Sequence, residues 1–159
     1  MIDRFGRFSL TIFEISKYWH KIASDALAEY GLKSAHALYL TTMYKHSDGI
    51  TIPQLCEECG KDKSDASRML SILEKKGFVK KQEVNGSRYR GVLVLTDEGK
   101  AIAQQVSDLA AHIVEATSKD LTEEMRNSLY KSLDSIIVNL RQISKEPFYY
   151  ETADWSDIR

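Results

Sequence analysis

The sequence of 159 residues lacks the features that define several large classes of protein. No apolar run approaches the roughly 18 residues that a membrane-spanning helix needs. The N-terminal segment has neither the long apolar core nor the small-residue cleavage site of a signal peptide. The two cysteines, Cys56 and Cys59, are too few for a disulfide framework. These absences favour a reduced, cytoplasmic protein without a membrane partner.

Patterns that carry enzymatic chemistry are missing as well. The sequence has no arrangement of a nucleophile and a base, no phosphate-binding loop and no metal-ligand motif. We therefore expect a protein that is not an enzyme, with no cofactor and no metal. Internal repeats and low-complexity linkers are also absent, and the length fits one compact unit.

A net charge of −1 does not by itself indicate a nucleic-acid partner, but the charges are unevenly distributed. Residues 61–90 contain nine Lys or Arg and four Asp or Glu, a surplus of five positive charges. The remainder therefore carries −6, because the whole chain carries −1. A basic centre between acidic arms is typical of a local phosphate-binding face, although a solvated Lys-rich surface gives the same pattern.

The N-terminal part predicts two helices. Residues 2–30 form the first, because apolar side chains recur alternately four and three residues apart, as in helices that pack on another helix. These side chains are Phe8, Ile12, Ile15, Trp19, Ile22 and Ala26. Gly31 is expected to end this helix and Ser34 to cap the next, which stops at Ser47-Asp48-Gly49.

Residues 50–77 predict a helix-turn-helix. After a short strand at Ile50-Thr51, Thr51 caps a helix over Ile52–Cys59, and Gly60 ends it. Asp62 or Ser64 then starts a second helix, which Gly77 stops. Its apolar positions recur at helical spacing: Ala66, Met69, Leu70 and Leu73. Two short helices joined by a tight turn with glycine define this motif.

The period then changes from helical to extended. Phe78–Val84 and Tyr89–Leu95 are predicted strands, separated by a segment that begins with Asn85-Gly86, a strong hairpin signal. A hairpin directly after a helix-turn-helix is a wing. Thr96 then caps a helix that runs to about Ser118, and a last helix starts at Thr122. Apolar positions on the last helix are Leu129, Leu133, Ile136, Ile137 and Leu140.

The order of elements and the residues at fixed offsets resemble the MarR family of bacterial transcriptional regulators. The match spans about residues 5–145 and is most specific over 55–99. Its motifs are Asp62-Lys63-Ser64, Ser67-Arg68, Leu73-Glu74-Lys75-Lys76-Gly77-Phe78-Val79 and Leu95-Thr96-Asp97-Glu98-Gly99. The chain departs from the family at Ser87, where an acid often precedes the wing arginine, and at Ile72, where a polar or basic residue is common.

The resemblance implies a mainly α fold with a small β-hairpin wing, in which N- and C-terminal helices form a homodimer. Residues 1–30 would be the N-terminal dimerisation helix and 31–100 the DNA-binding winged helix-turn-helix. Residues 101–145 would be the C-terminal dimerisation helices and 146–159 an aromatic, acidic tail. The protein would bind a pseudo-palindromic operator in double-stranded DNA, as a repressor that a small-molecule effector releases.

Candidate DNA contacts lie on the second helix of the motif and on the wing. The side opposite the apolar positions presents base-reading candidates, and neighbouring cations are candidate phosphate contacts. The base-reading set is Ser64, Asp65, Ser67, Arg68 and Ser71. The cations are Lys63, Lys75, Lys80 and Lys81, with Arg88 and Arg90 near the wing tip.

Three alternatives stay open from the sequence. Cys56 and Cys59 share one helix face, and their CxxC spacing suggests redox or metal chemistry, although both positions are apolar in the family and favour core packing. His36 and His112 are candidate ligands of a metal sensor. Trp19, His36 and Tyr39 are candidates for an effector pocket. A winged-helix module that binds protein rather than DNA is the competing function.

Overall fold

The computed structural model describes the backbone of residues 4–84 and 87–145, and the side chains of residues 6–83 and 91–145. The elements, in chain order, are α1 (Arg4–Leu27), the 3-10 turn η1 (Ala28–Tyr30), α2 (Ser34–Tyr44), α3 (Ile52–Cys59), α4 (Lys63–Lys75), β1 (Val79–Val84), β2 (Ser87–Leu95), α5 (Asp97–Thr117) and α6 (Glu123–Ile143). They form two compact units, Met1–His112 and Ile113–Arg159. The mainly α fold with one antiparallel hairpin agrees with the sequence-based prediction.

Helices α3 and α4 form the predicted helix-turn-helix, and local polar groups define their ends. Thr51 caps α3, because its side-chain oxygen accepts the N–H of Gln54 at 3.4 Å. Gly60 then adopts φ 61°, a left-handed conformation that suits glycine. Of the two predicted starts of α4, Asp62 is the cap, because its Oδ1 accepts the N–H of Asp65 at 2.8 Å.

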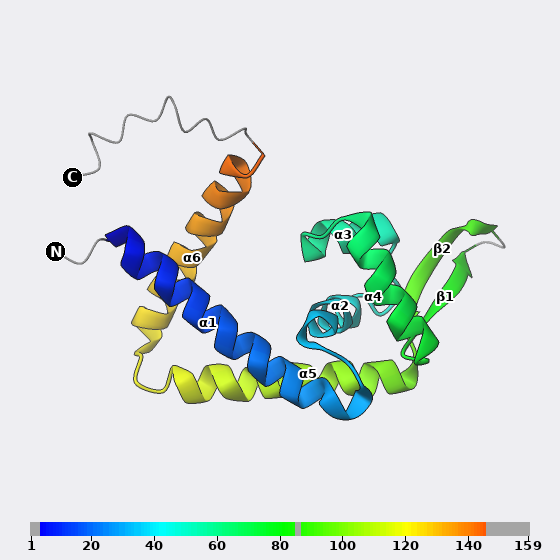
Figure 1. Ribbon diagram of the computed structural model, residues 1–159, viewed down its shortest axis with the longest axis horizontal. Coiled ribbons are helices and arrows are strands. Elements are labelled where there is room, and N and C mark those ends of the chain that lie inside the picture. Colours follow the sequence, from blue (N-terminus) through cyan, green and yellow to red (C-terminus); the bar gives the residue numbers. More distant parts are fainter. Residues whose placement is uncertain (1–3, 85–86, 146–159) are drawn as a thin grey trace. The chain divides into compact units, whose positions relative to one another are not determined.

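The wing is the antiparallel pair β1–β2, which projects from the end of α4 (Figure 1). Val79 pairs with Leu95 at its base, and Val84 pairs with Ser87 near its tip, with an irregularity between Gln82 and Val84. The predicted turn residues 85–86 lie outside the described residues. The predicted strand at Ile50-Thr51 is reduced to a single antiparallel bridge between Ile50 and Leu93.

Two predicted helix ends need correction. The α-helical part of the first helix ends at Leu27, and residues 28–30 tighten into a 3-10 turn before Gly31 at φ 63°. The cap of α2 is Lys33 rather than Ser34. His36 supplies the missing polar partner here, because its Nδ1 accepts the N–H of Lys33 at 3.0 Å.

The hydrophobic core lies within the unit Met1–His112. It joins the end of α1 to α2, α3, α4, both strands and the start of α5. Its most deeply buried side chains are Leu27, Tyr39, Leu40, Ile50, Leu55, Leu73, Leu93 and Ile102. The predicted α4 positions Ala66, Leu70 and Leu73 are buried, and Met69 is partly buried. The core therefore fixes which side of α4 faces outward.

Large apolar side chains remain exposed on α1 and on α6. The predicted stripe on α1 includes Phe8, Ile12, Ile15 and Trp19, and all four are exposed. In the separate unit Ile113–Arg159, α6 has no buried residue, and Leu129, Ile137 and Leu140 are exposed. Among the described residues, no helix has the length and apolar character to cross a membrane.

Candidate nucleic-acid interface

The outer face of α4 is defined by its side chains that are open to solvent, opposite the core. It comprises Lys63, Ser64, Ser67, Arg68, Ser71, Ile72 and Lys75. Six of these seven residues were predicted DNA contacts. Asp65, also predicted, is half-buried at the edge of this face. A helix that presents small polar groups and an arginine on one face can enter the major groove of DNA and contact base edges.

Arg68 is held by a neighbouring acid. Its Nη2 donates to Asp65 Oδ1 at 3.2 Å. The second oxygen of Asp65, Oδ2, accepts the hydroxyl of Tyr39, also at 3.2 Å. Tyr39 lies on α2 and is only 1% exposed. Burial and the charge of Asp65 raise the pKa of Tyr39, so its hydroxyl remains a proton donor at neutral pH.

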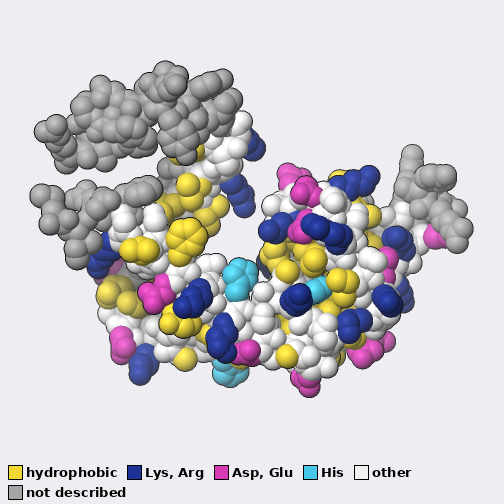
Figure 2. Space-filling view, in the orientation of Figure 1, with side chains coloured by type: hydrophobic (Ala, Val, Ile, Leu, Met, Phe, Trp, Pro, Cys, Tyr) yellow, Lys and Arg dark blue, Asp and Glu magenta, His cyan; other side chains and the backbone are white. Residues whose placement is uncertain are grey.

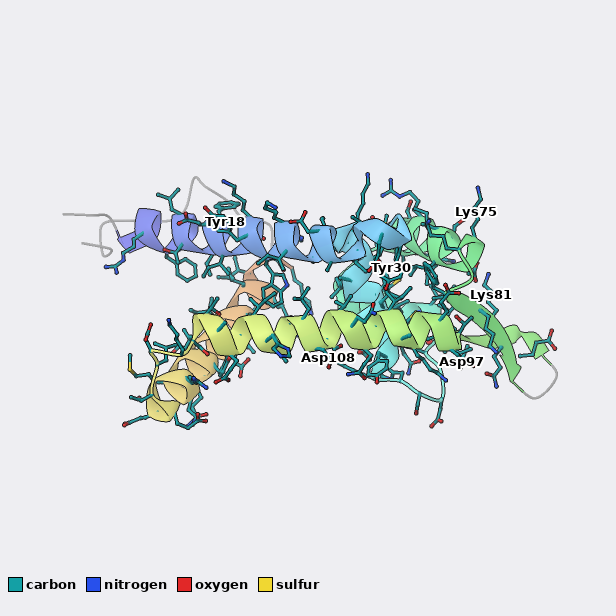
Figure 3. All side chains as sticks on the ribbon, turned by 90° about the horizontal axis from the view of Figure 1, so that it is seen from below. Tyr18, Tyr30, Lys75, Lys81, Asp97 and Asp108 are labelled. Atoms are coloured by element: carbon teal, nitrogen blue, oxygen red, sulfur yellow. The ribbon has the colours of Figure 1, made fainter. Side chains whose placement is uncertain are left out.

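Cations continue from α4 onto the wing. Lys75 lies at the end of α4 and Lys81 lies on β1, and both are at the wing end of this unit (Figure 3). Lys80 and Lys81 are exposed, and Lys81 Nζ lies 3.5 Å from Glu74 Oε1. Figure 2 shows Lys and Arg side chains scattered over the visible face of the winged-helix part, with Asp and Glu between them. Cations that are interspersed with acidic side chains in this way suit contacts with individual phosphates.

The wing arginines belong to β2, but the side chains of Arg88 and Arg90 lie outside the described residues. Their predicted contacts with DNA therefore stay predictions. The start of β2, where the family often has an acid, is Ser87 in this chain.

The Cys56-x-x-Cys59 pair has the environment of core residues. Both thiols are free. Cys59 is buried, and its Sγ lies 3.6 Å from Thr42 Oγ1. Burial raises the pKa of Cys59, which disfavours the thiolate that redox and metal chemistry require. Cys56 is partly buried against the same core.

His36 and His112, the candidate ligands of the alternative metal-sensor interpretation, have separate surroundings. His36 is 3% exposed and caps α2 through Nδ1. Its buried Nε2 has no hydrogen-bond partner among the described residues. His112 lies on α5, where its Nδ1 is 2.9 Å from Asp108 O. Within residues 6–83 and 91–145, no group of three or more His, Cys, Asp or Glu side chains is arranged to hold a metal ion.

The three residues predicted to line an effector pocket also differ in exposure. Trp19 on α1 is open to solvent, whereas His36 and Tyr39 are buried in the core around α2. Tyr39 also contacts α4, because its hydroxyl donates to Asp65. The sequence pattern missed this link, because nothing in a sequence indicates which acid a tyrosine 26 positions away will meet.

Comparison with known proteins gives the same assignment as the geometry. Residues 30–88, which span α2 to the start of β2, match the model of the MarR family. This segment is therefore similar to the MarR family, and the structure folds it as a helix-turn-helix followed by a wing. The resemblance predicted from the sequence is confirmed. No curated protein matches the chain.

Solved structures share the fold over most of the chain. A putative MarR family transcriptional regulator from Listeria monocytogenes, complexed with a 26mer DNA, is 21% identical with a TM-score of 0.77; the match covers 87% of this chain and 96% of that one. MepR from S. aureus, complexed with DNA, is 19% identical with a TM-score of 0.75; 84% of this chain and 96% of that one are covered. A MarR transcriptional regulator from Methanosarcina mazei Go1 is 21% identical with a TM-score of 0.73; the match covers 86% of this chain and 97% of that one.

Proposed function

We propose that this protein is a homodimeric transcriptional repressor that binds a pseudo-palindromic operator in double-stranded DNA. The observation that carries this proposal is the outer face of α4, where an arginine and several small polar side chains stand opposite a packed core beside a basic wing. Two proteins with the same fold are complexed with DNA. The winged-helix segment 61–90 supplies a surplus of five positive charges for the phosphate backbone.

A second copy of the chain is proposed to cover the apolar residues on α1 and α6. In one chain, Phe13 on α1 is 74% exposed and Val138 on α6 is 62% exposed. Water-exposed apolar surface costs about 25 cal/mol per Å², which favours a partner that buries it. A two-fold dimer would present two copies of α4 to half-sites about 10–10.5 bp apart, centre to centre. Sedimentation of Phe13→Asp against wild type tests this interface, because a buried charge should convert dimer to monomer.

The DNA test begins with selection of a duplex from a randomised library by the wild-type protein. Arg68→Ala and Arg88→Ala, combined, should abolish preference for the selected duplex, because each good base contact contributes roughly 1–3 kcal/mol. Fluorescence anisotropy measures the affinity, and sedimentation shows whether the dimer persists. The logarithm of the affinity should fall linearly with the logarithm of salt concentration through counterion release.

The matched control removes two positive charges from elsewhere on the surface. Lys100→Ala and Lys119→Ala, combined, change the net charge equally but leave α4 and the wing intact. This control should keep the wild-type preference for the selected duplex. If the Arg68 and Arg88 double variant bound that duplex as tightly as wild type, the assignment of α4 and the wing to DNA reading would fail. Failure of the wild type to select any duplex would instead favour the protein-binding module.

The second part of the proposal is that a small-molecule effector releases the protein from its operator. Trp19, His36 and Tyr39 lie on the helices that would connect the dimer interface to the reading head. A compound that binds the folded dimer must raise its stability, so a thermal-shift screen with aromatic acids, zinc and peroxide tests the effector classes. A true effector must also lower affinity for the selected duplex, since the two binding equilibria are linked.

A further inference from the structure

One carboxylate connects the buried core to the outer face of α4. Asp65 accepts the hydroxyl of Tyr39 through Oδ2 at 3.2 Å and the guanidinium of Arg68 through Oδ1 at 3.2 Å. Its backbone N–H also donates to Asp62 Oδ1 at 2.8 Å. Hydrogen bonds thus fix both the backbone and the side chain of Asp65 independently of its contact with Arg68.

This connection differs from an ordinary pair of charges on a surface. An exposed ion pair usually contributes little, because two long side chains must lose freedom to meet. Here the side chain of Arg68 is 71% exposed, but that of Asp65 is only 28% exposed and is already fixed by Tyr39. Tyr39 in turn is packed in the core of the unit. Only Arg68 therefore loses freedom when the pair forms.

The pairing leaves Arg68 able to read a base. Among the described residues, its polar contact is the single one from Nη2 to Asp65. A guanidinium has five N–H donors, so enough remain for a bidentate contact with O6 and N7 of guanine. The negative charge of Asp65 also repels phosphates, which makes Arg68 a weaker ligand for DNA backbone of any sequence.

We infer that Tyr39 and Asp65 are positioning residues that present Arg68 to a guanine and so raise the preference for operator over other DNA. This inference rests on the proposed function, because it assigns a specific task within the same interface. Tyr39 acts through Asp65 and does not itself contact DNA. The chemistry recognised is the major-groove edge of a G·C pair.

The experiment uses the duplex selected by the wild-type dimer and compares it with a scrambled duplex of equal length. Each guanine of the half-site is replaced in turn by 7-deazaguanine, which lacks the N7 acceptor. The guanine whose replacement weakens the wild type but not Arg68→Ala is the one that Arg68 reads. Loss of one hydrogen bond should weaken wild-type binding about two- to tenfold at that position.

Tyr39→Phe should lower the preference for the selected over the scrambled duplex by about two- to tenfold, since it removes one hydrogen bond that orients the carboxylate. It should also reduce the penalty of 7-deazaguanine at the guanine read by Arg68. The salt dependence should stay unchanged, because no charge is lost. Asp65→Asn should lower the same preference chiefly by tightening binding to the scrambled duplex.

Tyr30→Phe is the matched control. It also removes one hydroxyl from this unit, but that hydroxyl donates to Gln105 Oε1 on α5 at 2.6 Å rather than to a residue of α4. This variant should keep the wild-type preference and 7-deazaguanine penalty. If Tyr39→Phe also kept both, or if Tyr30→Phe lost them equally, the positioning role would be wrong while the proposed function stood. If the wild type selected no sequence, the proposed function itself would be wrong.

Discussion

Gly99 at the start of α5 offers a sharp test, because two effects predict opposite signs for Gly99→Ala. In a helix, alanine is favoured over glycine by about 0.5–1 kcal/mol. At Gly99, however, an added Cβ would lie 2.0 Å from the backbone oxygen of Phe78 and 2.9 Å from its carbonyl carbon. That oxygen also accepts the N–H of Thr96 at 3.0 Å. Glycine here allows α5 to pack directly against the backbone of Phe78, the residue before β1.

The clash should outweigh the gain in helix propensity. Ordinary van der Waals contact begins at 3.4 Å, so the backbone of Phe78 would have to move by roughly 1.4 Å or α5 would have to tilt. Overpacking of this kind costs about 1–3 kcal/mol. Loss of the hydrogen bond from Thr96 to Phe78 adds about 0.5–1.5 kcal/mol. After the propensity gain, we expect Gly99→Ala to lower the free energy of unfolding by about 1–3 kcal/mol.

Urea unfolding at one fixed protein concentration measures this change. The matched control is Ala101→Gly, at an exposed position two residues further along the same helix. It should destabilise by about 1 kcal/mol from propensity alone. Glycine should thus be preferred at position 99 and alanine at 101. Equal or greater stability of Gly99→Ala would refute the packing argument, and the contact between α5 and Phe78 would then be adjustable.

Three further predictions concern His36, Asp62 and Ile72. Burial lowers the pKa of His36 below 6.5, so below that pH the unfolded chain binds more protons than the folded one and stability should fall on acidification. Between about pH 7.5 and 5.5, the melting temperature should fall less for His36→Gln than for wild type. Asp62→Ala removes the cap of α4 and should destabilise by about 1 kcal/mol in urea unfolding, whereas Asp62→Asn should not. Ile72 is exposed on the outer face of α4, where it can contact the methyl group of a thymine. Replacing that thymine by uracil in the selected duplex should weaken binding of the wild type but not of Ile72→Ala.

Local signals in the sequence were sufficient for most of the elements. The caps Thr51, Thr96 and Thr122 are correct, because each hydroxyl accepts a backbone N–H three residues later. Gly31 and Gly60 end their helices in left-handed conformations, as predicted. The error at Ser34 arose because the cap of α2 uses a histidine nitrogen, a partner that propensity rules do not include.

The outer face of α4 was also predictable, since the 3.6-residue period assigns each position to the core or to solvent once the helix is recognised. The contact between Tyr39 and Asp65 was not predictable. It depends on how α2 packs against α4, which places the Tyr39 hydroxyl 3.2 Å from Asp65 Oδ2. The close approach of Gly99 to Phe78 is likewise a property of two elements that meet only after folding.

The order of helices and strands, the ends of most elements and the basic segment 61–90 all follow from residues close together along the chain. The predicted DNA-binding surface follows from them, because a helix or hairpin orients its own side chains. Contacts between α2 and α4, the burial of His36 and the packing at Gly99 depend on residues far apart in sequence. Such contacts were decided only by the tertiary structure, because the distance between two side chains depends on how their elements pack.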